Sequence, residues 1–161
     1  MKNSATLVNM TTLDDIDRRI LRALDENPRA TVQLLAQQLG YARGTVQSRV
    51  EKLFRQGRLR PNSTTVFPRD LGYPVRAFVT AEANQDELST MMTDIARVPE
   101  VVECLAISGS EDLMLQVVAR DAEHLYDITQ RLMLCHGIRR TSTSLVLREL
   151  MAHRMDQLIG D

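Results

Sequence analysis

The first third of the chain carries apolar side chains at the three- and four-residue spacing of amphipathic helices. One stripe predicts a first helix that begins after Thr12 and ends at Asn27-Pro28-Arg29, because proline disfavours helical geometry in the residue before it. The segment Thr12-Leu13-Asp14-Asp15 matches a capping box, which predicts that Thr12 caps this helix. The expected inward positions are Leu13, Ile16, Ile20, Leu21 and Leu24.

Two further helices are predicted. A short one runs from about Thr31 to Leu39, and Gly40 after it can take the left-handed conformation that ends a helix. The other follows Ala42 and runs to about Gln56, where Gly57 stops it. The expected inward positions are Val32, Leu35, Ala36 and Leu39 in the short helix and Val46, Val50, Leu53 and Phe54 in the other. This order is typical of a helix-turn-helix; a generic three-helix bundle is the alternative.

Residues 58–74 are rich in turn-forming residues and predict a connection, in which Thr64-Thr65-Val66-Phe67 forms either a linker strand or a loop. Strands are then predicted to alternate with helices. The predicted strands cover 75–83, 101–108, 113–119 and 138–147, and the predicted helices cover 86–97 and 122–136. Helix positions expected to face the sheet are Leu88, Met91, Met92 and Ile95, then Leu125, Ile128 and Leu132. The order βαββαβ is ferredoxin-like.

The predicted fold class is therefore α+β, with four segments. A three-helix helix-turn-helix domain, winged or simple, covers residues 1–62, and a linker covers 63–74. A ferredoxin-like domain covers 75–150, and residues 151–161 form a C-terminal tail, either a short helix or a loose end. Both helices of the ferredoxin-like domain should cover one sheet face. The other face should carry Phe78, Cys104, Ala106, Met114, Val118 and Val146. Such an apolar face needs a cover, which predicts at least a dimer.

Charge separates the two halves of the chain. Residues 1–62 have 11 Lys and Arg against 6 Asp and Glu, whereas the remainder has 9 against 15. A basic front half and an acidic back half suggest modules with different partners, although a solvated basic helix would look similar. Cys104 and Cys135 lack metal-site spacing and are expected to be buried free thiols rather than a disulfide or metal pair. No transmembrane run or secretory signal is evident, so we expect a cytoplasmic protein without a membrane partner.

Several segments together resemble the Lrp/AsnC family, the leucine-responsive and asparagine-responsive regulators of bacteria and archaea. They are LDDIDRRIL at 13–21, LAQQLG at 35–40, VQSRVEKL at 46–53, DLG at 70–72, GSED at 109–112 and GI at 137–138. The resemblance implies a DNA-binding domain joined to a domain that binds an effector and assembles dimers, tetramers or octamers. Ala42 departs from the family's usual serine before the recognition helix, and Gly57-Arg58-Leu59 departs from its usual Gly-Val-Ile.

The third predicted helix carries the candidate contacts to double-stranded DNA. Residues near the start of a recognition helix reach base edges, so Arg43 suits guanine and Gln47 suits adenine. Lys52 and Arg55 are expected to neutralise phosphates. The full set of DNA-binding candidates is Arg43, Thr45, Gln47, Ser48, Lys52 and Arg55. Arg49 lies beside the inward stripe, where pairing with Asp14 or Asp17 is favoured over a DNA contact.

The effector site is expected around the turn at residues 109–112. Glycine allows close approach of a ligand to the backbone, and a carboxylate suits a ligand amino group. The resemblance implies a pocket near this turn for a small molecule such as an amino acid. The effector-binding candidates are Ser108, Gly109, Glu111, Asp112, Thr141 and Thr143, and the alternative is an ordinary hairpin turn.

Enzyme signatures are poor, and no catalytic residue, metal or cofactor is predicted. His124, His136 and His153 lack metal-ligand spacing, and no glycine-rich phosphate loop follows a predicted strand. Sirohaem decarboxylases look similar in their two-domain organisation, but they need histidines on the sheet, and the predicted strands contain none. An architectural DNA-compacting protein that answers to no metabolite is a further alternative.

Overall fold

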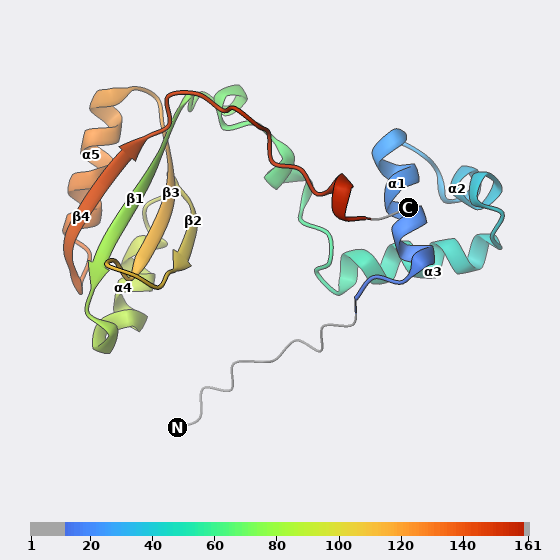
Figure 1. Cartoon of the computed structure of the whole chain (residues 1–161), viewed down its shortest axis with the longest axis horizontal. Helices are drawn as coiled ribbons and strands as arrows, with labels where there is room; N and C mark the ends of the chain where they lie inside the picture. Colours follow the sequence, from blue (N-terminus) through green and yellow to red (C-terminus); the bar gives the residue numbers. More distant parts are fainter. Residues whose placement is uncertain (1–11, 160–161) are drawn as a thin grey trace. The chain divides into compact units, whose positions relative to one another are not determined.

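The structure of the 161-residue chain is a computed structural model that describes residues 12–159 (Figure 1). It divides into two compact parts. The helical unit comprises residues 12–61 together with 152–159, and the sheet unit runs from Asn62 to Met151. No helix within 12–159 is long and apolar enough to cross a membrane.

The helical unit contains the three predicted helices: α1 at Asp15–Glu26, α2 at Val32–Leu39 and α3 at Arg43–Arg55. Thr31 caps α2 by accepting a hydrogen bond from the Leu34 backbone N–H, and Gly40 closes α2 with φ +73°, as predicted. The six buried side chains of its core come from all three helices: Ile20, Ala23, Leu35, Ala36, Val46 and Leu53.

Two details of these helices correct the sequence prediction. Asp14, not Thr12, caps α1: its carboxylate accepts the Asp17 backbone N–H at 3.0 Å, since a carboxylate is a stronger acceptor than a hydroxyl at the positive end of a helix. Phe54 was expected to face inward but is 54% exposed. Leu53 takes the inward position, and the next residue is rotated by about 100° around the helix axis.

The connection before the sheet contains no strand between α3 and residue 75, so neither a linker strand nor a wing is present in this described stretch. It forms two short 3-10 helices, η1 at Asn62–Thr65 and η2 at Pro68–Leu71. The Thr65 hydroxyl donates a hydrogen bond to the Asn62 carbonyl at 2.6 Å. This local bond competes with the extended conformation that the β-branched residues favour.

The sheet unit has the predicted βαββαβ order. Its strands are β1 at Val75–Ala83, β2 at Val101–Ala106, β3 at Leu113–Ala119 and β4 at Ile138–Leu145. They form one antiparallel sheet in the order β2-β3-β1-β4. A 3-10 turn, η3 at Gln85–Glu87, leads into α4 at Leu88–Ile95, and α5 covers Ala122–Met133.

Both helices cover the same sheet face, as expected. Met91 and Ile95 of α4 are buried, and the inward positions predicted for α5 (Leu125, Ile128 and Leu132) are all buried as well. Leu88 and Met92 were expected to face the sheet but are 47% and 38% exposed. The helix is only eight residues long, so the pair one turn apart, Met91 and Ile95, fills its contact with the sheet.

The other face of the sheet, here called the open face, differs from the prediction in β2. Cys104 and Ala106 pair with Leu115 and Leu113, which are buried on the helix-covered side, so they share that side. The cause is a register shift between Val101 and Glu103, because one extra residue reverses which side chains face each way. Phe78, Met114, Val118 and Val146 remain on the open face, with polar neighbours such as Gln116 and Ser144 opposite Phe78.

Candidate nucleic-acid interface and effector site

The outer side of α3 presents the residues predicted to contact DNA. Val46 and Leu53 are buried in the helical core, which turns the opposite side of the helix to solvent. Five of the candidates are exposed and Lys52 is half-buried. The exposed ones are Arg43, Thr45, Gln47, Ser48 and Arg55.

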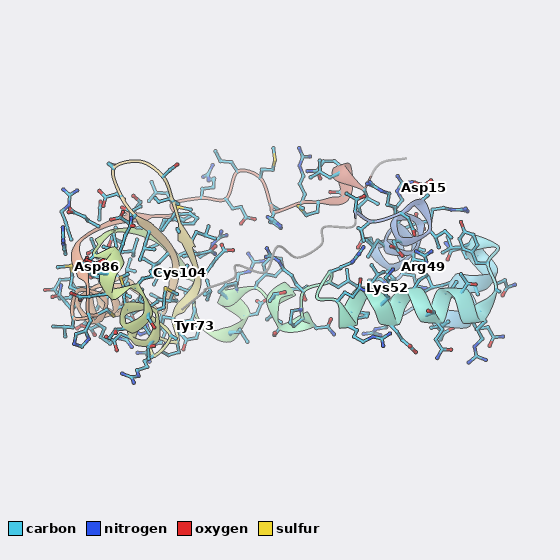
Figure 2. All side chains as sticks on the ribbon, turned by 90° about the horizontal axis from the view of Figure 1, so that it is seen from below. Asp15, Arg49, Lys52, Tyr73, Asp86 and Cys104 are labelled. Carbon is cyan, nitrogen blue, oxygen red and sulfur yellow. The ribbon has the colours of Figure 1, made fainter. Side chains whose placement is uncertain are left out.

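Arg49 is turned away from this surface and lies between α3 and α1, as Figure 2 shows. Its guanidinium pairs with Asp14 and, at 3.2 Å, with Asp17, whose side chain is only 4% exposed. Arg58 reaches the same Asp17 carboxylate at 4.0 Å. The predicted pairing of Arg49 with α1 is therefore confirmed, and it ties α3 to the start of α1.

The opposite charges of Asp14 and Arg49 shift each other's pKa values. The Asp17 backbone N–H and then the Arg49 guanidinium lower the pKa of Asp14 below its usual range. The hydrogen bond to Asp14 in turn raises the pKa of Arg49. Both shifts favour the charged forms of Asp14 and Arg49, in which the two side chains attract each other.

Gln47 has a partner of its own. Its side-chain amide nitrogen donates to a carboxylate oxygen of Glu51, one helical turn away, at 3.1 Å. Reading an adenine requires both the amide oxygen and the amide nitrogen of Gln47. The amide nitrogen of Gln47 carries two N–H groups, so one can stay on Glu51 while the other, together with the amide oxygen, pairs with a base edge.

The start of α3 has features that the sequence reasoning only partly found. Ala42 makes no side-chain cap, as its lack of an oxygen predicts, but its backbone carbonyl accepts the Thr45 N–H at 3.0 Å and the Val46 N–H at 3.2 Å. Next to it, the Tyr41 hydroxyl accepts a hydrogen bond from Arg19 at 2.7 Å, and the Arg19 guanidinium lies 5.2 Å from the ring centre. Tyr41 also packs on the helical core, so it covers the helix junction. Arg19 was missed because no sequence spacing links it to Tyr41.

The turn at residues 109–112 has the geometry that its glycine predicts. Gly109 has φ +138°, a conformation that side-chain-bearing residues rarely adopt. Asp112 joins the start of β3 to the end of β1: its backbone N–H donates to the Ala81 carbonyl at 3.0 Å, and its carboxylate accepts the Ala83 N–H at 2.8 Å. The carboxylate therefore already satisfies a strand-end donor in the protein.

Glu111 lies in a network of charges at the same end of the sheet. One of its oxygens accepts a hydrogen bond from Arg140 at 2.9 Å, and Arg140 also lies 3.9 Å from Glu82. The other oxygen of Glu111 is buried and has no hydrogen-bond partner in the described protein. A buried carboxylate oxygen without a donor is costly, so an N–H group that reached this atom would gain a hydrogen bond.

Thr141 and Thr143 are not brought together with Glu111. They pair with Ala81 and Val79, which are buried on the helix-covered side, whereas Arg140 pairs with Glu82 on the open face. The Thr141 hydroxyl donates to the sulfur of Met133 in α5 at 3.2 Å. The two threonines thus lie on the helix-covered side, whereas the carboxylate of Glu111 is bound by Arg140 from the open face.

A buried polar cluster near the start of α5 was also missed. The His124 Nε2 lies 3.1 Å from Glu100, and its Nδ1 accepts the Arg120 backbone N–H at 3.2 Å. Burial opposes ionisation of Glu100, but its hydrogen bonds, including those from Arg131 and His124, leave its pKa lowered. The His124 ring therefore links the Arg120 backbone to Glu100 within the protein, which indicates a structural role.

No group of three or more His, Cys, Asp and Glu within residues 12–159 could hold a metal ion. Cys104 is half-buried and Cys135 is buried, and both are free thiols. Burial raises the pKa of each thiol, which disfavours the reactive thiolate.

Two family models match the chain: the AsnC-type helix-turn-helix domain over residues 13–53 and the Lrp/AsnC ligand binding domain over residues 76–156. The chain belongs to the Lrp/AsnC family. An uncharacterised HTH-type transcriptional regulator from Pyrococcus abyssi is 32% identical over 135 residues, which cover 83% of this chain and 85% of that protein. The resemblance seen in the sequence is thereby confirmed, and this Lrp/AsnC protein is a DNA-binding transcriptional regulator.

Solved structures agree with this assignment. Escherichia coli AsnC has a TM-score of 0.79 and 26% identity to this Lrp/AsnC chain, covering 90% of it and 99% of AsnC. The Neisseria meningitidis transcriptional regulator NMB0573, solved as a complex with L-Met, has a TM-score of 0.75 and 26% identity, covering 88% and 94%. The predicted fold class, a helix-turn-helix with an α+β second domain, is confirmed.

Proposed function

We propose that this Lrp/AsnC protein is a sequence-selective regulator that acts in the cytoplasm, assembles dimers or higher oligomers, and senses an amino acid or a related metabolite. The observation that carries the proposal is that the two sides of α3 differ in what their polar side chains contact. Arg49 is bound to two aspartates of α1, while the neighbouring candidate side chains project from the outer side of α3. An outer helix side with exposed polar groups over a fixed inner side suits insertion into a major groove.

The DNA contacts divide by position along α3. In this proposal Arg43, at the start of the helix, donates two hydrogen bonds to a guanine, and Gln47 pairs with an adenine while its second N–H stays on Glu51. Thr45 and Ser48 add less selective hydroxyl contacts. Lys52 and Arg55 in the last turn contact phosphates and set the register on the duplex.

The effector site is proposed at the turn that contains Ser108, Gly109, Glu111 and Asp112. The unpartnered oxygen of Glu111 offers an acceptor for a ligand ammonium group, and the NMB0573 complex with L-Met supports an amino acid as the ligand class. Thr141 and Thr143 are proposed as separate hydroxyl contacts on the helix-covered side.

Self-assembly is proposed through the open face. Phe78 and Met114 lie there on neighbouring strands, and an apolar cluster on a sheet face is normally covered. A second copy offers the same cluster, and a symmetric dimer would also present two α3 helices to two half-sites.

The first test is DNA binding by the full chain. Fluorescence anisotropy would compare a labelled duplex from the upstream region of its own gene with a shuffled duplex over a salt series. Tight, salt-sensitive binding that favours the native duplex is expected. Equal affinity for both duplexes would favour an architectural protein, and no binding at low salt would contradict the DNA interface.

Two variants test the orientation of α3. Gln47→Ala should relax base preference, whereas Lys52→Ala should weaken binding evenly across sequences and reduce the slope of log affinity against log salt by about one. If both variants bind DNA like the parent chain, α3 does not present this side to the duplex.

The effector site is tested with Asp112→Asn and Glu111→Gln. Asparagine keeps an acceptor oxygen for the Ala83 N–H while removing the charge, so the hairpin is preserved. Titration with a panel of amino acids by calorimetry should show binding to the parent chain and at least about tenfold weaker binding to Glu111→Gln, since a charge-assisted bond is lost. Equal affinity would remove Glu111 from the site.

A further inference from the structure

The last described residues of the chain lie against its first helix. Residues 156–158 form one 3-10 turn, η4 at Asp156–Leu158, and Figure 1 shows this red segment beside α1. The Arg18 guanidinium on α1 donates to the carbonyls of Leu158 at 3.2 Å and Ile159 at 2.6 Å. Residues 152–159, here called the C-terminal strap, accordingly belong to the helical unit.

The chemistry of this contact suits an arginine. The carbonyls at the end of a helical turn have no partner within the turn, and a cation there satisfies them and the local dipole. Arg18 also donates from Nε to the Leu13 carbonyl at 3.3 Å, which holds its guanidinium in place. Ile159 is half-buried, whereas every residue from 147 to 158 is exposed, so the contact is concentrated at the end of the strap.

The strap changes how the two units are connected. The chain leaves the helical unit after Pro61 and returns to it at Ala152. Without the Arg18 contact, the sheet unit would be joined to the helix-turn-helix by one effective linker, and the strap would not be held on α1. With the contact, there are two linkers, and a second linker reduces the conformational freedom of the pair.

We propose that the C-terminal strap is a second tether, held on α1 by Arg18, that restrains the helix-turn-helix of each subunit for binding to paired half-sites. The regulatory part of this proposal rests on the proposed DNA-binding function; the docking of the strap does not. Few contacts hold the strap, so it can dock and release, and this equilibrium is a point at which DNA affinity is adjusted without a change in the surface of α3.

Docking is tested by amide hydrogen exchange in the full chain, without DNA. The Leu158 and Ile159 amides donate within η4, so in the docked strap they should exchange at least about tenfold more slowly than in a free peptide of residues 152–161. Arg18→Met should raise exchange to the peptide rate. Arg154→Met, the same substitution within the strap but away from the contact, should leave exchange protected.

Peptide-like exchange in the parent chain, or protection that survives Arg18→Met, would overturn the docking. Loss of protection in both variants alike would also overturn it, because the effect would then not depend on the Arg18 contact. These outcomes are read without DNA and are independent of whether the chain is a regulator.

The regulatory consequence is tested with two duplexes, one carrying two half-sites and one carrying a single half-site. Arg18→Met, and separately a chain ending at Met151, should bind the paired duplex about three- to tenfold more weakly and the single half-site unchanged. In the shortened chain, Arg18→Met should have no further effect on paired-site affinity. Unchanged paired-site affinity, or equal losses on both duplexes, would overturn the tether, whereas no binding by the parent chain would instead contradict the proposed function.

Discussion

His136 and Asp94 form an exposed pair that fastens the connection between α5 and β4 to the end of α4. An oxygen of Asp94 lies 2.6 Å from the His136 Nδ1 and also accepts the His136 backbone N–H at 3.2 Å. The side-chain hydrogen bond raises the pKa of His136 and lowers the pKa of Asp94, with Glu87 and Arg97 adding smaller charge effects. The His136–Asp94 pair therefore sets the pH range over which the connection between α5 and β4 is bonded to α4.

The stability that this pair contributes depends on pH, because the pKa values of both His136 and Asp94 are shifted. The raised pKa of His136 contributes stability that is complete below about pH 6.5 and is lost as the pH rises through the folded value. The lowered pKa of Asp94 contributes stability above about pH 4 that is lost in stronger acid. An NMR titration of the His136 ring should show a midpoint above 6.5 that falls in Asp94→Asn. An unchanged midpoint would mean that the pair does not form in solution.

Arg49 is expected to matter for folding more than for DNA binding. Arg49→Met would leave the enclosed Asp17 with only Arg58 at 4.0 Å, so the free energy of unfolding of the helical unit should fall by about 1–3 kcal/mol. Denaturant unfolding followed by circular dichroism would measure this loss.

Two variants control the Arg49 experiment. Lys52→Met should leave unfolding nearly unchanged while weakening DNA binding. Adding Asp17→Asn to Arg49→Met should recover part of the lost stability, because the unpaired buried charge is gone. If Arg49→Met instead weakens DNA binding at full stability, the residue acts at the interface.

At the scale of elements, the start of β4 depends on Gly137. This glycine has φ +80°, and a Cβ there would lie 3.0 Å from the Glu87 Cβ at the start of α4. Its carbonyl also accepts the Asn84 N–H at 2.8 Å, which joins the loop before β4 to the end of β1. The position therefore combines a conformational and a steric demand for glycine.

Gly72 provides a matched comparison within the same unit, because it has φ +88° with open space around its Cβ position. Gly72→Ala should lower the free energy of unfolding by about 1–2 kcal/mol for the backbone alone. Gly137→Ala should lower it by about 1 kcal/mol more, because Glu87 must move. Thermal unfolding would measure both variants, and an equal loss of unfolding free energy in the two would show that Glu87 adjusts without cost.

Helices and strands could be predicted from the sequence wherever one residue decides a boundary. Thr31 and Gly40 bound α2 through backbone conformation and a local hydrogen bond, so their effects were visible in the sequence. The side-chain directions in β2 could not be predicted, because a bulge arises from pairing with β3 and leaves no local signature. The candidate site shows the same limit: the turn around Gly109 was predictable, but the link between Glu111 and Arg140 depends on strand order.

At the scale of the whole molecule, the open face should govern self-association. Phe78→Asp would place a charge among the side chains proposed to meet in the dimer, so the dimer dissociation constant should rise at least about tenfold. Tyr126→Asp is the control, because Tyr126 lies on α5, on the helix-covered side, and is 63% exposed. Sedimentation velocity would measure the dimer dissociation constant of both variants. Dissociation caused by Tyr126→Asp and not by Phe78→Asp would place the contact on the helix side.

The adjacency of the first and last strands of the sheet unit has a consequence for engineering. β1 and β4 pair antiparallel, and the Val146 N–H donates to the Arg76 carbonyl at 2.9 Å, so the start of β1 and the end of β4 lie next to each other. This is the arrangement of a domain inserted into a host, since adjacent ends can be spliced into a host chain with little disturbance. We therefore expect that a different α+β domain with adjacent ends could be exchanged for the segment between the start of β1 and the end of β4.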